Sequence, residues 1–299
     1  MRLVIISMLG PADLYVLRHV LERWPTATIL RPVDVRRPGT PPRRRRWHRL
    51  LTAPHLLARG WLRAQVRRRI DRYADRTTRA ELLGEGPHAA MLPPHLEVPV
   101  WALRDGTFAT RLADLAPDIL LLVSAPLLPP EILAVPRRPT VNLHHGIAPA
   151  YRGEGCNYHA LAHEDWEQLG ITLHRATPGI DRGALYVQAR IALDPGDDDA
   201  TVMVKGARLA AREVVALLEA MQHGRMAGRR QPRGRLWRYD DWTLRSWIRR
   251  AWRRHVLKRN PPHLEERVTR WYAPENRLPA RATRTSPGRD PIRSGPGSA

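Results

Sequence analysis

The chain has 299 residues, a formal net charge of +21 and a single cysteine. The 43% share of hydrophobic residues excludes a chain that is disordered throughout, and one cysteine excludes an internal disulfide framework. The apolar runs at 1–9 and 119–123 are far shorter than the roughly 20 residues that a membrane helix needs. We therefore expect a protein of the cytoplasm that has one large domain or two ordinary ones.

The positive charge is concentrated in two segments. Residues 31–79 hold 16 basic and 3 acidic side chains, and residues 225–299 hold 20 basic and 6 acidic ones. The remaining residues are mildly acidic, with 14 basic and 20 acidic side chains. Two interpretations stay open: arginines that only solvate the surface, or a surface that binds an anionic ligand.

The N-terminal part begins with an apolar run at Leu3–Ser7 that is typical of a buried strand. Asp13 can cap a helix that follows it, and residues 28–33 predict a second strand. The segment 36–46 is rich in proline and arginine and predicts an exposed loop. Residues 48–84 predict a basic helix with one apolar face, which would include Leu62 and Tyr73, and arginines on the other.

Short elements continue along the chain. The pattern predicts strands at 98–103, 118–124 and 140–144, with helices at 106–115 and 129–134 between them. The strand at 118–124 is the clearest buried one, because its residues are almost all aliphatic.

A helix at 157–163, strands at 169–175 and 184–192, and an amphipathic helix at 201–223 complete this pattern. Strands that alternate with helices predict an α/β domain with a mostly parallel sheet over residues 1–224. Residues 34–92 would form a basic, largely helical insertion in this domain.

The C-terminal part has a different composition. Residues 225–273 are rich in tryptophan and arginine, and residues 274–299 predict a disordered tail. For the stretch 235–259 we expect a helix that packs its tryptophans on the core and turns its arginines outward. The alternative is that these side chains stack on bases or lie at a lipid interface.

The residues that can carry chemistry lie at the end of one strand and in one turn. Asn142 and His144 share one face of a strand because side chains alternate with a period of two, and that strand ends in a loop. Asp181 lies in a glycine-flanked turn between two predicted strands. An amide, an imidazole and a carboxylate suit acyl transfer to an amine, since they can stabilise an oxyanion, move a proton and orient the imidazole.

Three stretches around these residues resemble the formyltransferase superfamily: 118–133, 141–153 (VNLHHGIAPAYRG) and 170–191. The resemblance is clearest over 95–224. It implies a Rossmann-like catalytic domain, 10-formyltetrahydrofolate as the formyl donor, and no metal. It also implies that Asn142, His144 and Asp181 are the catalytic residues.

The resemblance further implies two groups of binding residues. The folate would contact residues of the loop after the strand at 118–124 and of the loop before Asp181: Ser124, Ala125, Pro126, Leu127, Leu128, Ala176, Thr177, Gly179 and Ile180. The acceptor would contact residues that follow His144: His145, Gly146, Tyr151, Arg152 and Gly153.

The function implied by the resemblance is N-formylation of a primary amine on a small molecule, such as a phosphorylated amine or a nucleotide-linked amino sugar. Three alternatives stay open: hydrolysis of 10-formyltetrahydrofolate, a methionyl-tRNA formyltransferase-like activity, and a non-catalytic protein that binds nucleic acid or a membrane surface. Family members that act on tRNA carry a second β-barrel domain, for which residues 225–299 are too short and too rich in arginine. We therefore do not expect a nucleic acid as the partner.

Two other candidates have weaker support. Cys156 and His144 are a possible nucleophile and base, but we expect Cys156 to be a small residue without a catalytic role. His159 and His163 are four residues apart, as in some metal sites, but no matching carboxylates or cysteines accompany them.

Overall fold

The computed structural model describes residues 1–38, 54–85, 91–238, 241 and 243–272. The predicted tail at 274–299 and most of the predicted loop at 36–46 lie outside the described residues.

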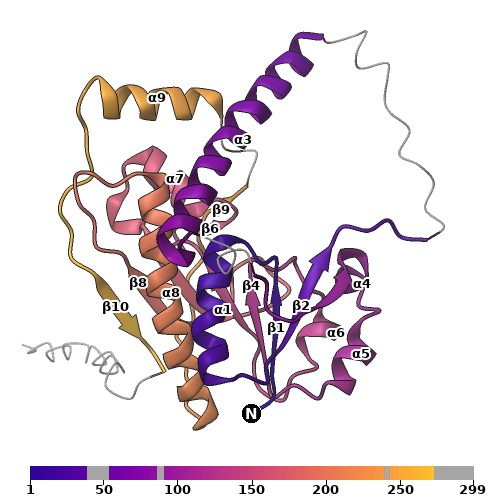
Figure 1. Cartoon of the computed structure of the whole chain (residues 1–299). Coiled ribbons are helices and arrows are strands. Elements are labelled where there is room, and N and C mark those ends of the chain that lie inside the picture. Colours follow the sequence, from indigo (N-terminus) through magenta and orange to yellow (C-terminus); the bar gives the residue numbers. More distant parts are fainter. Residues whose placement is uncertain (39–53, 86–90, 239–240, 242, 273–299) are drawn as a thin grey trace, which may run out of the picture.

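An eight-stranded sheet forms the centre of the molecule, in the order β10-β8-β7-β5-β4-β1-β2-β3 (Figure 1). Five strands from β5 to β3 are parallel, and β7, β8 and β10 each run antiparallel to their neighbours. The predicted α/β fold with a mostly parallel sheet is therefore confirmed. The strands are β1 Leu3–Ser7, β2 Thr28–Val33, β3 Leu96–Pro99, β4 Ile119–Val123, β5 Val141–His144, β7 Gly170–Arg175, β8 Leu185–Arg190 and β10 Arg267–Arg270.

Helices cover both faces of the sheet (Figure 1). Alternate residues of β1 enter different cores: Leu3 and Ile5 pack into one cluster, and Val4 and Ile6 into the other. The helices over the first face are α1 Pro11–Arg23, α8 Asp199–Gln222 and the end of α3 Pro54–Leu83. Those over the second face are α4 Val100–Arg104, α5 Ala109–Asp114 and α6 Pro130–Leu133.

The C-terminal part of α3 packs against α1 and α8, and the buried side of the helix there carries Ala74, Thr78 and Leu82. The prediction that Leu62 and Tyr73 share its buried face is wrong, since both are exposed. The N-terminal part of α3 extends past the helices that it would have to contact (Figure 1).

The strand predicted at 98–103 is also partly wrong. β3 ends at Pro99 and α4 begins at Val100. A proline has no N–H to continue a ladder, and its fixed φ suits the residue that precedes a helix.

The C-terminal segment returns to the sheet instead of forming a separate body. β9 Leu236–Trp237 pairs with β6 Arg152–Gly153, just after the loop that follows β5, and β10 pairs with β8. Between them lies α9 Leu244–His255, which packs on α7 Cys156–His163. None of the helices in the described ranges is long and apolar enough to cross a membrane.

The expectation that tryptophans point inward and arginines outward holds for only part of this segment. Trp237 is buried, but Trp252 on α9 is half exposed. Arg250 and Arg253 of α9 point inward and form ion pairs with Asp199 and Glu164. On α9, two arginines thus face the domain because its carboxylates attract them, whereas Arg245 and Arg249 are exposed as expected.

Candidate active site

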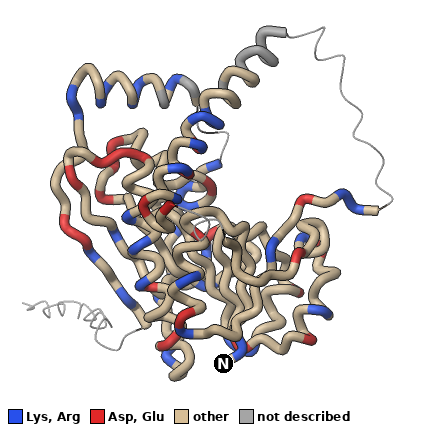
Figure 2. The backbone as a smooth tube through the Cα atoms, in the orientation of Figure 1, with Lys and Arg blue, Asp and Glu red and all other residues tan. Residues whose placement is uncertain are grey.

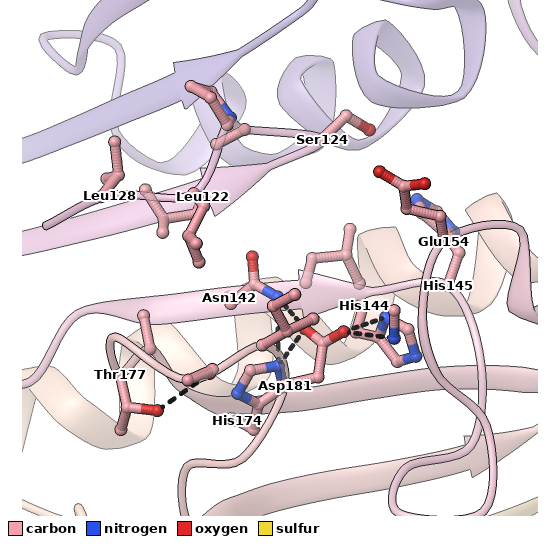
Figure 3. A pocket seen from close by; sticks show the side chains of 18 of the residues that line it. Leu122, Ser124, Leu128, Asn142, His144, His145, Glu154, His174, Thr177 and Asp181 are labelled. Carbon is pink, nitrogen blue, oxygen red and sulfur yellow. Dashed lines mark hydrogen bonds and ion pairs between the residues drawn. The ribbon is translucent and has the colours of Figure 1, made fainter. Parts of the chain in front are cut away.

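A pocket of about 900 Å³ opens beyond the carboxyl ends of β4 and β5, the edge at which open α/β sheets bind ligands (Figure 3). Asn142, His144 and Asp181 all line it. So do His145 and Gly153, and so do all nine residues that the resemblance assigns to the folate: Ser124, Ala125, Pro126, Leu127, Leu128, Ala176, Thr177, Gly179 and Ile180.

The position of Asn142 and His144 follows from the place of β5 in the sheet. β5 lies between β4, which is parallel to it, and β7, which is antiparallel. After His144 the chain turns, and Thr172 of β7 holds this turn by donating to the Gly146 carbonyl at 2.6 Å and accepting from the Ala148 N–H at 3.1 Å. The two side chains at the strand end are thereby fixed toward the pocket.

Asp181 lies in the loop between β7 and β8, with a left-handed backbone (φ 48°). Its Oδ2 accepts the Gly153 N–H at 2.8 Å, and its Oδ1 accepts the Asn142 amide at 3.2 Å. Burial alone would raise the pKa of this carboxyl. The adjacent His144 and His174 rings and the Gly153 N–H outweigh burial and hold the pKa well below its usual range. Asp181 is therefore a carboxylate at neutral pH.

His144 is buried beside this carboxylate, with Nδ1 3.4 Å from Asp181 Oδ2. Its Nε2 lies 2.8 Å from the Tyr151 carbonyl oxygen, which can only accept, so Nε2 carries a proton. Burial lowers the pKa of His144, and the charge of Asp181 offsets only part of that effect. The ring is therefore neutral at pH 7, with Nδ1 as its basic nitrogen.

The amide of Asn142 is oriented by its neighbours. Its Nδ2 lies 3.2 Å from Asp181 Oδ1 and 3.1 Å from His174 Nε2, and Figure 3 shows the amide oxygen directed away from Asp181, toward the loop after β4. A carboxylate attracts an amide N–H and repels an amide oxygen, which fixes this orientation. In this arrangement the group that Asn142 offers to the pocket is an acceptor.

His174 is a further member of the site that the sequence analysis did not single out. It is 2% exposed and lines the pocket from β7, where it is the direct cross-strand partner of Asn142. Its Nδ1 lies 2.8 Å from the Arg175 carbonyl, so that nitrogen carries a proton. Its Nε2, 3.1 Å from Asp181 Oδ1, can then accept from Asn142 or, when protonated, donate to Asp181.

A C-terminal strap, residues 229–238, closes one side of the site. Gln231 Nε2 donates to the carbonyls of Asp181 at 2.8 Å and of Gly183 at 2.7 Å, and thereby fixes the loop of the carboxylate. The last three residues of the strap, Leu236, Trp237 and Arg238, line the pocket. Sequence reasoning missed all of these residues, since it treated 225–273 as an extension outside the catalytic domain.

The strap can approach this closely because of Gly153. This residue has φ 105°, and a Cβ on it would lie 2.1 Å from the Trp237 carbonyl oxygen. Its N–H is the one that binds Asp181. A glycine at this position therefore allows β6 to pair with β9 and also positions the Asp181 carboxylate.

Three of the predicted acceptor-side residues do not line this pocket. Gly146 does not line the pocket; a Cβ there would lie 2.5 Å from Cys156 Cβ and 2.9 Å from His144 Nε2, so the glycine makes room for the imidazole. Tyr151 is buried, stacks on Trp237 and contributes its carbonyl to His144. Arg152 is buried too, and its guanidinium donates to the Ile180 and Gly234 carbonyls at 2.8 and 2.9 Å.

The two weaker candidates can also be placed. Cys156 is buried, and burial raises the pKa of its thiol, so it is not a thiolate at neutral pH. His163 Nδ1 lies 2.6 Å from the carbonyl of His159, and both rings lie against Trp237. Among the described residues, no group of three His, Cys, Asp or Glu side chains is arranged to hold a metal ion.

Comparison with known proteins agrees with this geometry. Residues 87–221 match the family model described as formyl transferase. A methionyl-tRNA formyltransferase of Salinispora tropica is 34% identical over 130 residues, which are 43% of this chain and 42% of that protein. A methionyl-tRNA formyltransferase of Burkholderia pseudomallei is 35% identical over 147 residues, 48% of this chain and 45% of that protein. The chain thus spans less than half the length of these relatives.

Solved structures share the fold at lower identity. A sugar N-formyltransferase from Shewanella sp. superposes with a TM-score of 0.53 at 13% identity, over 84% of this chain and 86% of that one. Glycinamide ribonucleotide transformylase 1 from Symbiobacterium toebii gives a TM-score of 0.50 at 18% identity, over 78% of this chain and 92% of that one. The family match includes Asn142, His144 and Asp181 and excludes the strap. Over residues 87–221 this chain is thus similar to the formyl transferase family.

Proposed function

We propose that the chain transfers a formyl group from 10-formyltetrahydrofolate to a primary amine of a small molecule, and that it does so in the cytoplasm. The observation that carries this proposal is the arrangement around Asp181. One ionised carboxylate contacts a neutral imidazole, an amide and a second imidazole on the floor of a pocket at the sheet edge.

The first role of this arrangement is to activate the amine. The neutral His144 can accept a proton at Nδ1, and the imidazolium so formed is paired with Asp181 at 3.4 Å. The amide oxygen of Asn142 faces the pocket and can accept an N–H of the incoming amine, which orients the nitrogen lone pair. Donation by Asn142 to an oxyanion, the role expected from sequence, requires this amide to rotate away from Asp181.

The second role is to stabilise negative charge on the formyl oxygen. The positive charge that His144 acquires lies in a buried site, where electrostatic interactions are stronger than in water. Asp181 keeps that charge local and prevents the imidazolium from losing its proton prematurely. On collapse of the tetrahedral intermediate the bond between the formyl carbon and the folate nitrogen would break, and His144 could return its proton to that nitrogen as tetrahydrofolate leaves. No side chain of the site has to become covalently attached for these steps.

The residues on the other side of the pocket fit a folate. Leu122, Leu128, Leu133 and Ala176 form an apolar wall, and Ser124, Thr177 and Gly179 also line the pocket. An apolar wall with polar residues nearby suits a flat heteroaromatic ring with hydrogen-bonding edges. When bound there, the folate supplies the activated formyl group.

The charges of the pocket favour an acceptor with a cationic amine. Among the described residues that line it, Arg238 is the single arginine, and Glu154 lies with His145 on the side away from the apolar wall (Figure 3). Arg152, which would have suited a phosphate, donates to backbone carbonyls instead. We therefore propose an acceptor whose amine is not close to a phosphate group.

The same machinery could hydrolyse 10-formyltetrahydrofolate, and the relatives named methionyl-tRNA formyltransferases raise the possibility of a tRNA acceptor. A volume of about 900 Å³ is at the upper end for a single small ligand and favours transfer to a second substrate. The described part of residues 225–272 forms the strap, α9 and a strand of the main sheet.

One assay separates these activities. The protein is incubated with 10-formyltetrahydrofolate and a panel of amines, unformylated methionyl-tRNA included, and products are analysed by mass spectrometry for the gain of one formyl group. We expect formylation of at least one small amine, and loss of it in His144→Ala. Formation of tetrahydrofolate at the same rate without any amine would identify a hydrolase, and formylation of tRNA alone would refute the small acceptor.

A further inference from the structure

The helix α9 is attached to the domain by its arginines. Arg250 pairs with Asp199 at the start of α8, and Arg253 pairs with Glu164 at 3.3 Å. Arg254 donates to the carbonyls of Asp197 and Gly196. These contacts fix which side of α9 faces the protein.

The opposite side of α9 carries apolar side chains that face solvent. Ile248, Trp252 and Val256 are spaced four residues apart and are 53%, 51% and 61% exposed. Residues four apart lie on one face of a helix, so these three form a continuous stripe. An amphipathic helix of a water-soluble domain normally turns this stripe toward the core.

The surroundings of the stripe are strongly basic. Residues 243–260 contain six arginines and one lysine and no acidic residue. Arg245 and Arg249 lie on the exposed side of the helix next to Ile248. Figure 2 shows Lys and Arg along α9 and on neighbouring α3.

The helix α3 adds to the same end of the molecule. Its Tyr73 hydroxyl contacts Asp198 at 3.2 Å, one residue from the partner of Arg250, so α3 and α9 both contact the start of α8. From there α3 extends outward, with Trp61 64% exposed and Leu62 46% exposed. Arg68, Arg69 and Arg72 are exposed on the same helix.

We propose that the outward side of α9, with Trp61 and Leu62 of α3, docks on an anionic lipid bilayer surface. A tryptophan and aliphatic side chains among arginines can enter the boundary between headgroups and acyl chains while the arginines contact anionic headgroups. A nucleic acid would account for the arginines but leave Ile248 and Val256 in water. This inference does not depend on the proposed formyl transfer.

The test uses the full chain and a dye that reports a change from water to lipid. Cys156 is buried, so a cysteine introduced at Val256→Cys is the accessible thiol for labelling. Leu96→Cys, at an equally exposed apolar position on edge strand β3, is the matched control. We expect the label at 256 to shift to the blue with phosphatidylglycerol-containing vesicles, and not with phosphatidylcholine alone, while the label at 96 does not respond.

Flotation with the same vesicles measures the affinity. We expect Ile248→Ser with Trp252→Ser to weaken binding at least about tenfold, and Arg245→Ala with Arg249→Ala to weaken it by a similar factor. Unchanged circular dichroism and melting temperature show that the variants are folded. No vesicle response at 256 would overturn the proposal. So would a response to a DNA duplex in place of vesicles, or a shift that depends on protein concentration alone and so reports self-association.

Discussion

Two parts of the chain surround the same pocket, and they do so by different means. β5 and the loop between β7 and β8 supply side chains, namely Asn142, His144 and Asp181. The strap at 229–238 supplies hydrogen bonds that position the site: Gln231 donates to the Asp181 and Gly183 carbonyls, and the Gly234 carbonyl accepts from Arg152. The first part lies inside the family match and the second outside it.

The first part carries out the reaction, and the second part positions the reacting groups. When a side chain that accepts a proton or carries a charge is removed, no other contact can take over its role. A hydrogen bond that positions a loop is one of several: Asp181 is also bound by the Gly153 N–H and by Asn142, in addition to the bond to its own carbonyl. We therefore expect the loss of activity to decrease from the first part to the second.

The largest effect is expected for His144→Ala. This change removes the proton acceptor and the positive charge that forms beside the formyl oxygen, so turnover should fall by about 10³-fold or more. His19→Ala is the matched control, because His19 is a half-buried histidine of α1 that does not line the pocket. Steady-state formylation measures both. A similar loss in the two variants would contradict the role of His144.

Asp181→Asn tests the charge of the carboxylate and should lower turnover by about 10²-fold to 10³-fold. It also makes a prediction on pH. His144 works as a base only when neutral, and burial places its pKa below the usual 6.5, so kcat/KM of the wild type should be constant above that pH and fall at lower pH. The carboxylate raises the pKa of His144, so in Asp181→Asn the fall should begin at still lower pH. A wild-type profile that falls toward high pH from neutrality would refute a neutral His144.

The extent to which sequence could predict these parts follows the same division. Asn142 and His144 are two residues apart on one strand, and Asp181 lies in a glycine turn between two strands, so local patterns place all three near one edge. The same alternation predicted most strands of the sheet. β1 and β2 have the predicted bounds, and in β1 a run of buried, mostly aliphatic residues makes the strand distinctive.

The rest depends on contacts between distant residues. His174 belongs to the site because the antiparallel register of β5 and β7 places it opposite Asn142, and a single sequence does not specify that register. Gln231 is 50 residues from Asp181 in the chain, and the β6–β9 pair is only two residues long. The orientation of α9 could not be inferred either, because the partners of its arginines, Asp199 and Glu164, are far away in sequence.

His174→Phe should lower turnover by about tenfold to 10²-fold, less than changes of the catalytic residues and more than changes of the strap. The ring fills the space but no longer contacts Asn142 or Asp181 through a nitrogen. Since the charge of His174 lowers the pKa of His144, the acidic limb of the pH profile should also move to higher pH. His174→Gln retains a polar group and should recover part of the rate. If His174→Phe had full activity and an unshifted pH profile, His174 would only fill space in the core and would have no role in catalysis.

The role of the strap is tested by comparing two replacements of Gln231. Gln231→Ala removes two hydrogen bonds from the Asp181 loop, which should cost about 2 kcal/mol of stability and lower kcat by less than about tenfold. Gln231→Glu should be worse, because a carboxylate can only accept and would face two carbonyl oxygens. Thermal unfolding and formylation rates measure the two effects. If the two variants had the same stability and the same rate, the hydrogen bonds that Gln231 donates to these carbonyls would not be what positions the loop.

The smallest effect is expected for Cys156→Ala. The thiol lies close to His144 in the chain, but it is 1% exposed, and burial raises its pKa so far that the thiolate is absent at neutral pH. Turnover should therefore stay within about twofold, and the native protein should resist alkylation by iodoacetamide. A folded Cys156→Ala protein that loses turnover as severely as His144→Ala would instead identify a covalent intermediate. In that case the thiol of Cys156, and not the acceptor amine, would attack the formyl group first, and His144 and Asp181 would serve to activate the thiol.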